Sequence, residues 1–182
     1  MACITKLATA IAYDCDSGAT GLLSALIINK ADIASYTVVP STLTVSALTL
    51  VSGAKAYKID TVKRSLVVSE ALKINEGAPN AYKHTATITS TLGRYDSSAN
   101  ALAMAISNGS FVVLTKYVSS MGAIASVYGL YYGMSATASE RSSHDNGSWF
   151  TYTIETPENV IGEDQLSMGL TEYNALFDAA VG

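Results

Sequence analysis

The chain has 182 residues and a formal net charge of −4, and only 14% of its residues are charged. This length fits one domain whose core needs no disulfides, and the negative charge excludes the basic field that favours nucleic acid. Soluble proteins are typically about 25% charged. The surface is therefore either rich in Ser, Thr, Tyr and Ala or buried against other subunits, and we favour the second.

The N-terminal residues do not have the pattern of a signal peptide or a membrane span. The longest apolar stretch, residues 21–29, is far shorter than the roughly 20 residues that a transmembrane helix needs. Residues 1–18 contain one lysine and a short apolar run, so we expect a chain that is not secreted. Cys3 and Cys15 lack the spacing and partners of a zinc site. We expect free thiols, with a disulfide as the alternative.

Alternating Val, Ile, Thr and Tyr residues predict strands through the first half of the chain. We expect these strands at residues 24–33, 35–40, 42–51, 54–60, 65–74 and 81–92. In the third of them the apolar side of the strand changes near Ala47 and Leu48. This change predicts either a β-bulge or burial on both faces.

Residues 96–109 have the pattern of an α-helix. The opening Asp-Ser-Ser offers three potential N-caps, and apolar residues then recur every three or four positions. Asn108 and Gly109 predict a left-handed helix end. A strand over residues 110–118 is expected to follow at once.

The last third of the chain adds two strands and a terminal segment. Residues 125–138 read as a strand in which Gly129 and Gly133 share one face, which indicates a close backbone approach or a bend. Residues 148–156 read as its partner, and residues 169–182 as a final helix or an extended arm. The whole order predicts a mainly β (α+β) fold, an antiparallel β-sandwich or open barrel with one flanking α-helix.

Neither histidine has the surroundings of a catalytic base. His84 lies in the 81–92 strand, in which Thr85 and Thr87 share one face, and we expect this histidine at the surface or at an interface. His144 lies among polar turn formers. The sequence has no Gly-x-Ser-x-Gly nucleophile elbow and no phosphate-binding glycine motif.

Acidic residues cluster without the pattern of an active site. A partial calcium-loop pattern in residues 13–21 fails at three positions of the EF-hand consensus. Glu155 and Glu158 are close in sequence, whereas glycosidase carboxylates face each other across a cleft. We expect both to be interface or lumen charges. The sequence therefore predicts no catalytic residue, no metal site and no cofactor.

The basic residues form one cluster, which comprises Lys55, Lys58, Lys63 and Arg64 with Tyr57 among them. Lysines on an exposed sheet edge oppose edge-to-edge pairing. We favour this role over contact with nucleic acid.

The order of a helix followed by NGSFVVLTKYVSS, GAIASVYGLYYGMSATASE and HDNGSWFTYTIETPENV resembles the core of tail tube proteins of tailed bacteriophages. It also resembles the related tube and ring proteins of phage tails and contractile injection systems. The opening MACITKLATAIAYDC, with GLLSALIINKADI after it, is similar to virion structural proteins of crAss-like and other Bacteroidales-infecting phages. The resemblance is one of layout and covers most of the chain.

The resemblance implies a non-enzymatic virion protein with one tail-tube-like domain over residues 1–182. Such subunits form homo-oligomeric rings through heterologous contacts. An N-terminal arm at about residues 1–20 and a C-terminal segment at about residues 166–182 would contact neighbouring subunits. The partners would be copies of the chain, neighbouring tail proteins, and DNA as transient cargo of the lumen. The protein would be made in the host cytoplasm and reside in the virion tail.

Three alternatives stay open at this point. A head–tail connector or tail-barrel ring protein would share the fold. A carbohydrate-binding β-sandwich would use Trp149 and the cluster of Tyr128, Tyr131 and Tyr132 as stacking platforms. A hydrolase would use Glu155 and Glu158.

Overall fold

A computed structural model describes residues 21–59, 66–73, 81–90, 97–118, 124–141, 150–157 and 164–181. Several sequence-based predictions concern other residues and so lie outside the described ranges. These are the N-terminal arm, residues 13–20 of the calcium-like stretch, Cys3, Cys15, Lys63, Arg64, His144, Trp149 and Glu158.

The described residues form eleven strands, one short 3-10 helix and two α-helices. The strands are β1 (Gly21–Asn29), β2 (Ile33–Val39), β3 (Thr44–Leu50), β4 (Tyr57–Ile59), β5 (Leu66–Lys73), β6 (Ala81–Ser90), β7 (Ser110–Val118), β8 (Ile124–Tyr128), β9 (Met134–Arg141), β10 (Phe150–Glu155) and β11 (Leu166–Gly169). The helices are η1 (Lys30–Asp32), α1 (Ser97–Asn108) and α2 (Leu170–Ala179).

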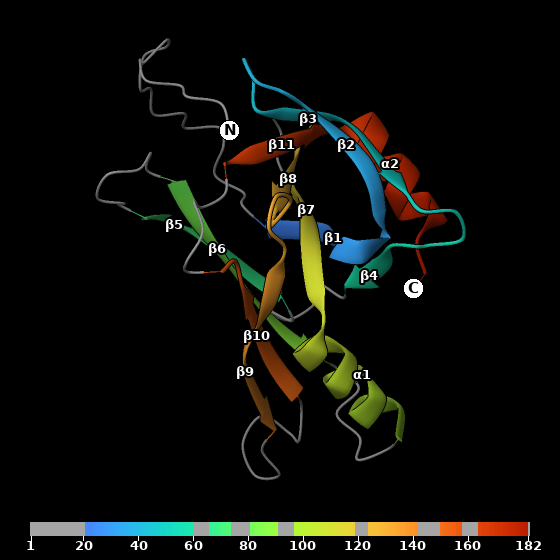
Figure 1. Cartoon of the computed structure of the whole chain (residues 1–182), viewed down its shortest axis with the longest axis vertical. Coiled ribbons are helices and arrows are strands. Elements are labelled where there is room, and N and C mark those ends of the chain that lie inside the picture. Colours follow the sequence, from blue (N-terminus) through green and yellow to red (C-terminus); the bar gives the residue numbers. More distant parts are fainter. Residues whose placement is uncertain are drawn as a thin grey trace.

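All eleven strands are hydrogen-bonded into one sheet (Figure 1). Its main path runs β2-β3-β11-β8-β7-β9-β10-β6-β5, and β4 joins it through β1, which pairs with β7. The strand pairs are antiparallel except for β3 with β11, which run parallel. The mainly β fold class predicted from the sequence is confirmed.

Strand β7 is the centre of the sheet because two strands share one of its edges. Residues 113–116 of β7 pair with β8, and residues 110–111 pair with β9. Strand β1 runs along the opposite edge of β7. The sheet therefore divides at β7 into two parts, each of which folds over one of its faces.

Each face of β7 packs into its own core. The first core comprises Ala25, Leu66, Ala86, Ile88, Ile106, Phe111, Val113, Tyr128, Met134, Tyr152 and Ile154. The second core comprises Leu26, Ile28, Val45, Ala56, Val112, Leu114, Ala125, Val127, Leu130, Leu166, Met168 and Tyr173. Strands β1 and β7 contribute alternate residues to both, as expected for strands that are buried on both faces.

Helix α1 packs on the first core, near β9 in Figure 1. Ile106 is buried there, and Leu102 packs beside it, so the apolar spacing of the predicted helix is used as expected. The predicted left-handed end is wrong, because Gly109 does not have a positive φ. Gly109 is needed for space: a Cβ there would collide with the Phe111 ring and lie 2.8 Å from the Ala105 carbonyl oxygen.

Helix α2 packs on the second core and confirms the predicted C-terminal helix (Figure 1). Tyr173 is fully buried, stacks on Phe177 at 6.0 Å between ring centroids, and its hydroxyl lies 2.8 Å from the Ser24 hydroxyl. After the helix, Val181 forms a parallel bridge with Tyr57 of β4. The C-terminal residues therefore cover one end of the second core.

Residues 125–138 form two strands joined by a turn, so the prediction of one continuous strand is wrong. The two glycines are responsible. Gly129 and Gly133 have φ values of 73° and 77°, which glycine adopts without steric cost. The Gly133 amide donates to the Gly129 carbonyl at 2.9 Å. Strand β9 then pairs with β10, as expected for these residues.

The irregularity predicted near Ala47 is a β-bulge that lies one residue earlier. Thr37 pairs with Ala47 and Val38 with Val45, so Ser46 is the extra residue. Because of this residue, Val45 and Leu48 both face the second core. The bulge explains the change of apolar side in the sequence.

Candidate functional site

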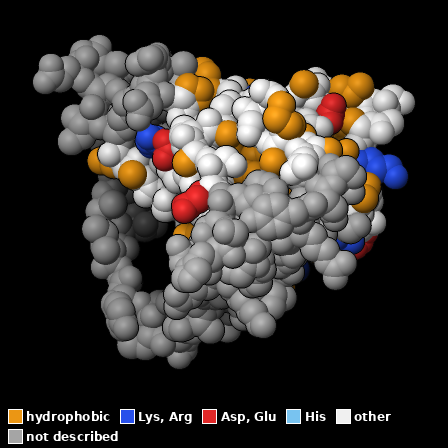
Figure 2. Space-filling view, turned by 90° about the horizontal axis from the view of Figure 1, so that it is seen from below, with side chains coloured by type: hydrophobic (Ala, Val, Ile, Leu, Met, Phe, Trp, Pro, Cys, Tyr) orange, Lys and Arg blue, Asp and Glu red, His pale blue; other side chains and the backbone are white. Residues whose placement is uncertain are grey.

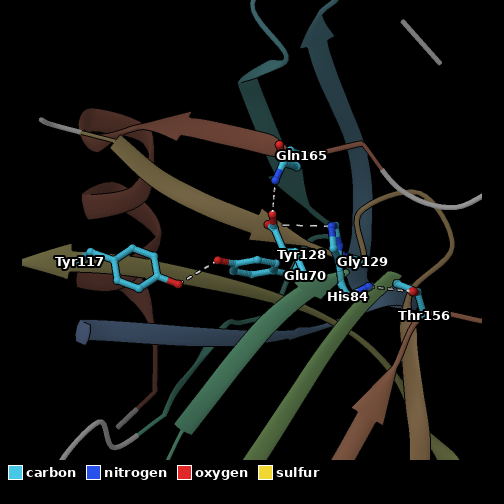
Figure 3. Close-up of polar contacts among 7 residues, drawn as sticks. All are labelled: Glu70, His84, Tyr117, Tyr128, Gly129, Thr156 and Gln165. Carbon is cyan, nitrogen blue, oxygen red and sulfur yellow. Dashed lines mark hydrogen bonds and ion pairs between the residues drawn. The ribbon is translucent and has the colours of Figure 1, made fainter. Parts of the chain in front are cut away.

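The most unusual chemistry in the described residues surrounds His84, which is fully buried (Figure 3). Strand β6 lies between β10 and β5, and His84 alternates in phase with Ala86 and Ile88 toward the interior. The prediction of a surface or interface histidine is therefore wrong. Its neighbours Glu70, Gly129, Thr156 and Gln165 complete what we call the His84 cluster.

The first contact of the imidazole fixes its tautomer. The Gly129 amide donates a hydrogen bond to His84 Nδ1 at 3.1 Å. A neutral imidazole with an accepting Nδ1 carries its proton on Nε2. The backbone amide that opens the turn between β8 and β9 is thus held by a side chain of β6.

Thr156, directly after β10, binds the backbone of the same residue. The His84 amide donates to Thr156 Oγ1 at 3.1 Å, and the Thr156 amide donates to the His84 carbonyl at 3.1 Å. Thr156 is itself buried, and the reciprocal bonds satisfy polar groups that would otherwise be costly to bury. These bonds extend the β6–β10 ladder beyond its last strand pair.

Glu70 of β5 lies on the other side of the imidazole. Its Oε1 is 3.9 Å from His84 Nε2, while its Oε2 accepts a hydrogen bond from the Gln165 side chain at 2.6 Å. The 3.9 Å separation between Glu70 Oε1 and His84 Nε2 is too long for a hydrogen bond. Nε2 has no hydrogen-bond partner among the described residues. The Nε2–H group of His84 is therefore a buried donor that lies close to the Glu70 carboxylate, while that carboxylate accepts a hydrogen bond from Gln165.

Burial lowers the pKa of His84 from 6.5 to about 4, because the charged form loses its hydration. The imidazole is therefore neutral at pH 7. A general base must reach a substrate proton, but Nε2 is enclosed by protein atoms. The arrangement thus suits a structural contact and not proton transfer to a bound molecule.

Two tyrosines extend the cluster on the side of β7. Tyr128 packs its ring edge-on against His84, with 5.3 Å between ring centroids, and its hydroxyl lies 2.9 Å from that of Tyr117. Burial, together with the Tyr117 hydrogen bond, raises the pKa of Tyr128 well above its ordinary value. Tyr128, which packs against the imidazole ring, is therefore neutral at pH 7.

Those acidic and basic residues singled out in the sequence that lie in the described ranges do not meet in one site. Glu155 pairs with Lys83 at 2.8 Å and accepts from Thr85 at 3.4 Å, on the face of β6 opposite His84. Lys58 lies 4.6 Å from the centre of the Phe177 ring. The described residues contain no group of three or more His, Cys, Asp or Glu side chains that could hold a metal ion.

Of the three tyrosines of the alternative sugar platform, Tyr128 ends β8, and Tyr131 and Tyr132 lie in the turn that follows. Tyr128 is buried in the first core, and Tyr131 donates to Asp164 at 3.2 Å. Tyr132 is exposed. Since the three rings do not share one open surface, they do not form the stacking platform that a sugar site needs.

Comparisons with protein-family models, with curated proteins and with solved structures found no match to this chain. In the part of the chain that the structure describes, neither helix is long and apolar enough to cross a membrane.

Proposed function

We propose that the protein is a non-enzymatic structural subunit of a phage virion, which forms the tail-tube-like rings through which DNA passes. Its partners would be further copies of the chain and the neighbouring tail proteins. It would be made in the host cytoplasm and built into the virion tail. A connector or tail-barrel ring of the same fold is the variant of this proposal that differs in position and copy number.

The observation that carries the proposal is the outer edge of β5. This strand ends the sheet path and, within the described ranges, pairs with β6 alone. The β5–β6 ladder has no register shift over eight residues, and Val67 and Leu72 are 53% and 56% exposed. A long, regular, apolar edge is a template for pairing with another chain. We infer that a neighbouring subunit covers it.

The shape of the edge at the opposite end of the sheet favours a ring of subunits over a two-fold dimer. Strand β2 ends the path there, and its pairing with β3 contains two register shifts, so this edge differs in shape from that of β5. Contacts between unlike surfaces are heterologous, and they close into a ring when the rotation between copies permits it.

The surface chemistry supports DNA as cargo rather than as a ligand. Figure 2 shows few charged side chains on the described part of the face that it presents. Thr87 of β6 and Thr153 of β10 place their hydroxyls 3.5 Å apart on the outer face of the sheet. Tight binding of DNA requires many Lys and Arg contacts with phosphates, and neutral hydroxyls do not supply them.

The proposal is tested by substituting lysine on the β5 edge. We expect light scattering and negative-stain images of the purified wild-type protein to show rings. In the double variant Val67→Lys, Leu72→Lys we expect monomers with an unchanged circular dichroism spectrum. Met104→Lys on α1 is the matched control, since Met104 is 63% exposed but lies away from the edge, and it should form rings.

Two results would overturn the proposal. One is a wild-type protein that stays monomeric at high concentration, and the other is a double variant that assembles as well as the control. Quantitative mass spectrometry of purified virions would then test the assignment to the tail, because a tube subunit is present in many more copies than a connector.

A further inference from the structure

The His84 cluster connects parts of the molecule that are far apart in sequence. The imidazole of β6 holds the turn of residues 129–133, and Glu70 of β5 is bound by Gln165 just before β11. Leu130 of that turn is buried in the second core, and Met134 after it is buried in the first. The cluster therefore lies where the two cores meet.

We propose that protonation of His84 releases the β5–β6 strand pair from the 129–133 turn, so that acid loosens the contact between the two cores. This inference does not depend on the proposed function.

Protonation of Nδ1 is incompatible with the hydrogen bond that this atom accepts. Its lone pair accepts the Gly129 N–H at 3.1 Å, and a protonated imidazole donates from both nitrogens. Two N–H groups would then face each other, so the hydrogen bond cannot persist. Gly129 is buried, and its amide would lose its acceptor unless the turn moves.

Glu70 supplies a partner for the charged form. Its Oε1 lies 3.9 Å from Nε2, the nitrogen that already carries a proton. A small shift of the imidazole toward β5 would convert this distance into a charge-assisted hydrogen bond. The His84 side chain is fully buried and the Glu70 side chain is 22% exposed, so the pair would offset part of the desolvation cost of the imidazolium.

The other charged groups on the elements around His84 are engaged elsewhere. Lys83 precedes it on β6 but faces the opposite side of the sheet, where it pairs with Glu155 of β10 at 2.8 Å. Asp164, before β11, accepts from Tyr131. Tyr128 of β8 is neutral, because its pKa is raised. Glu70 is thus the charged group in contact with the imidazole.

The direct test follows the Gly129 amide by nuclear magnetic resonance of the full chain. At pH 7 we expect a protected amide and a His84 ring with its proton on Nε2. Between pH 7 and pH 4.5, after correction for the intrinsic rate, exchange of this amide should become roughly 50-fold faster as His84 takes up a proton. The same protection at both pH values would overturn the inference.

Two variants separate this contact from general acid unfolding. His84→Asn keeps an acceptor on the γ-carbon but cannot be protonated, so the Gly129 amide should no longer respond to acid. Glu70→Gln removes the partner of the charged imidazole, so the response should move to lower pH. His144→Asn, which alters the other histidine of the chain, is the matched control and should respond as the wild type does. An acid response of equal size in His84→Asn would contradict the proposal.

Discussion

The two cores lie on opposite faces of the same strands, yet they are closed in different ways. The second core is covered by α2, and the chain end is fixed beside it by the Val181 bridge to β4. The first core is covered by α1, but at β5 its sheet ends in an exposed apolar edge. The His84 cluster lies at the border between the two cores.

The difference shows where the molecule depends on its surroundings. The second core contains no histidine and is covered by α2, so its stability is set mainly by apolar burial. The first core contacts the buried His84 through Tyr128 and adjoins the exposed edge of β5, which a neighbouring subunit would cover under the proposed function. Acid should therefore act first on the first core.

The largest expected effect comes from neighbouring residues of β7 that point into different cores. Leu114→Ala in the second core and Val113→Ala in the first remove buried side chains with exposed fractions of 0%. We expect Leu114→Ala to lower the free energy of unfolding by about 2–5 kcal/mol. Val113→Ala, which removes a smaller side chain, should cost less.

Because β7 is shared, both variants should shift one cooperative urea transition, followed by circular dichroism. A separate transition in either variant would show that the cores unfold independently. The two parts of the sheet would then act as separate domains.

The pH dependence of stability distinguishes the two cores, and its sign follows from the lowered pKa of His84. The folded protein binds the proton with a pKa of about 4, while the unfolded chain binds it near 6.5. The stabilising effect of the neutral form is therefore complete above pH 6.5 and is lost as the pH falls toward 4. The total is about 3 kcal/mol.

Urea unfolding at pH 7, 5.5 and 4.5 would measure this loss. Leu114→Ala should keep the same pH dependence, because the second core does not contain the histidine. A stability that is flat between pH 7 and pH 4.5 would show that His84 is equally accessible to protons in the folded and unfolded states.

The smallest expected effects come from one hydrogen bond in each region. Thr156→Val removes the hydroxyl that accepts from the His84 amide, and Ser24→Ala removes the partner of the Tyr173 hydroxyl. Each should lower the free energy of unfolding by about 1–2 kcal/mol. Neither hydroxyl contacts the His84 imidazole, so in thermal unfolding both variants should lose stability below pH 6 as steeply as the wild type does. A pH dependence that changes in Ser24→Ala would show that the acid response is not local to the His84 cluster.

Local patterns in the sequence predicted most elements but not the cluster. The strands, α1 and the C-terminal helix follow from spacings of two and of three to four residues, which depend on neighbours in sequence. The burial of His84 had a local signal as well, since His84, Ala86 and Ile88 alternate with threonines. Its partners had none, because Gly129 is 45 residues away and Thr156 is 72 residues away.

The glycines also show that local sequence patterns do not determine the folded conformation. Gly129 and Gly133 indicated a bend, but the turn exists because both residues adopt positive φ between two pairing strands. Asn108 and Gly109 suggested a left-handed helix end. The helix does end at Asn108, but Gly109 is required for the space beside the Phe111 ring and not for a positive φ. Contacts made by the folded chain decide between the conformations that a glycine permits.

The strand order also determines when each core can be completed during synthesis. The buried members of the first core lie between Ala25 and Ile154. The second core includes Leu26 near its start but also Leu166, Met168 and Tyr173. A ribosome must therefore release residues 166–173 before β11 can insert between β3 and β8. Such long-range pairing is slow to form, so the nascent chain carries the second-core faces of β1 and β7 partly uncovered until those residues have emerged.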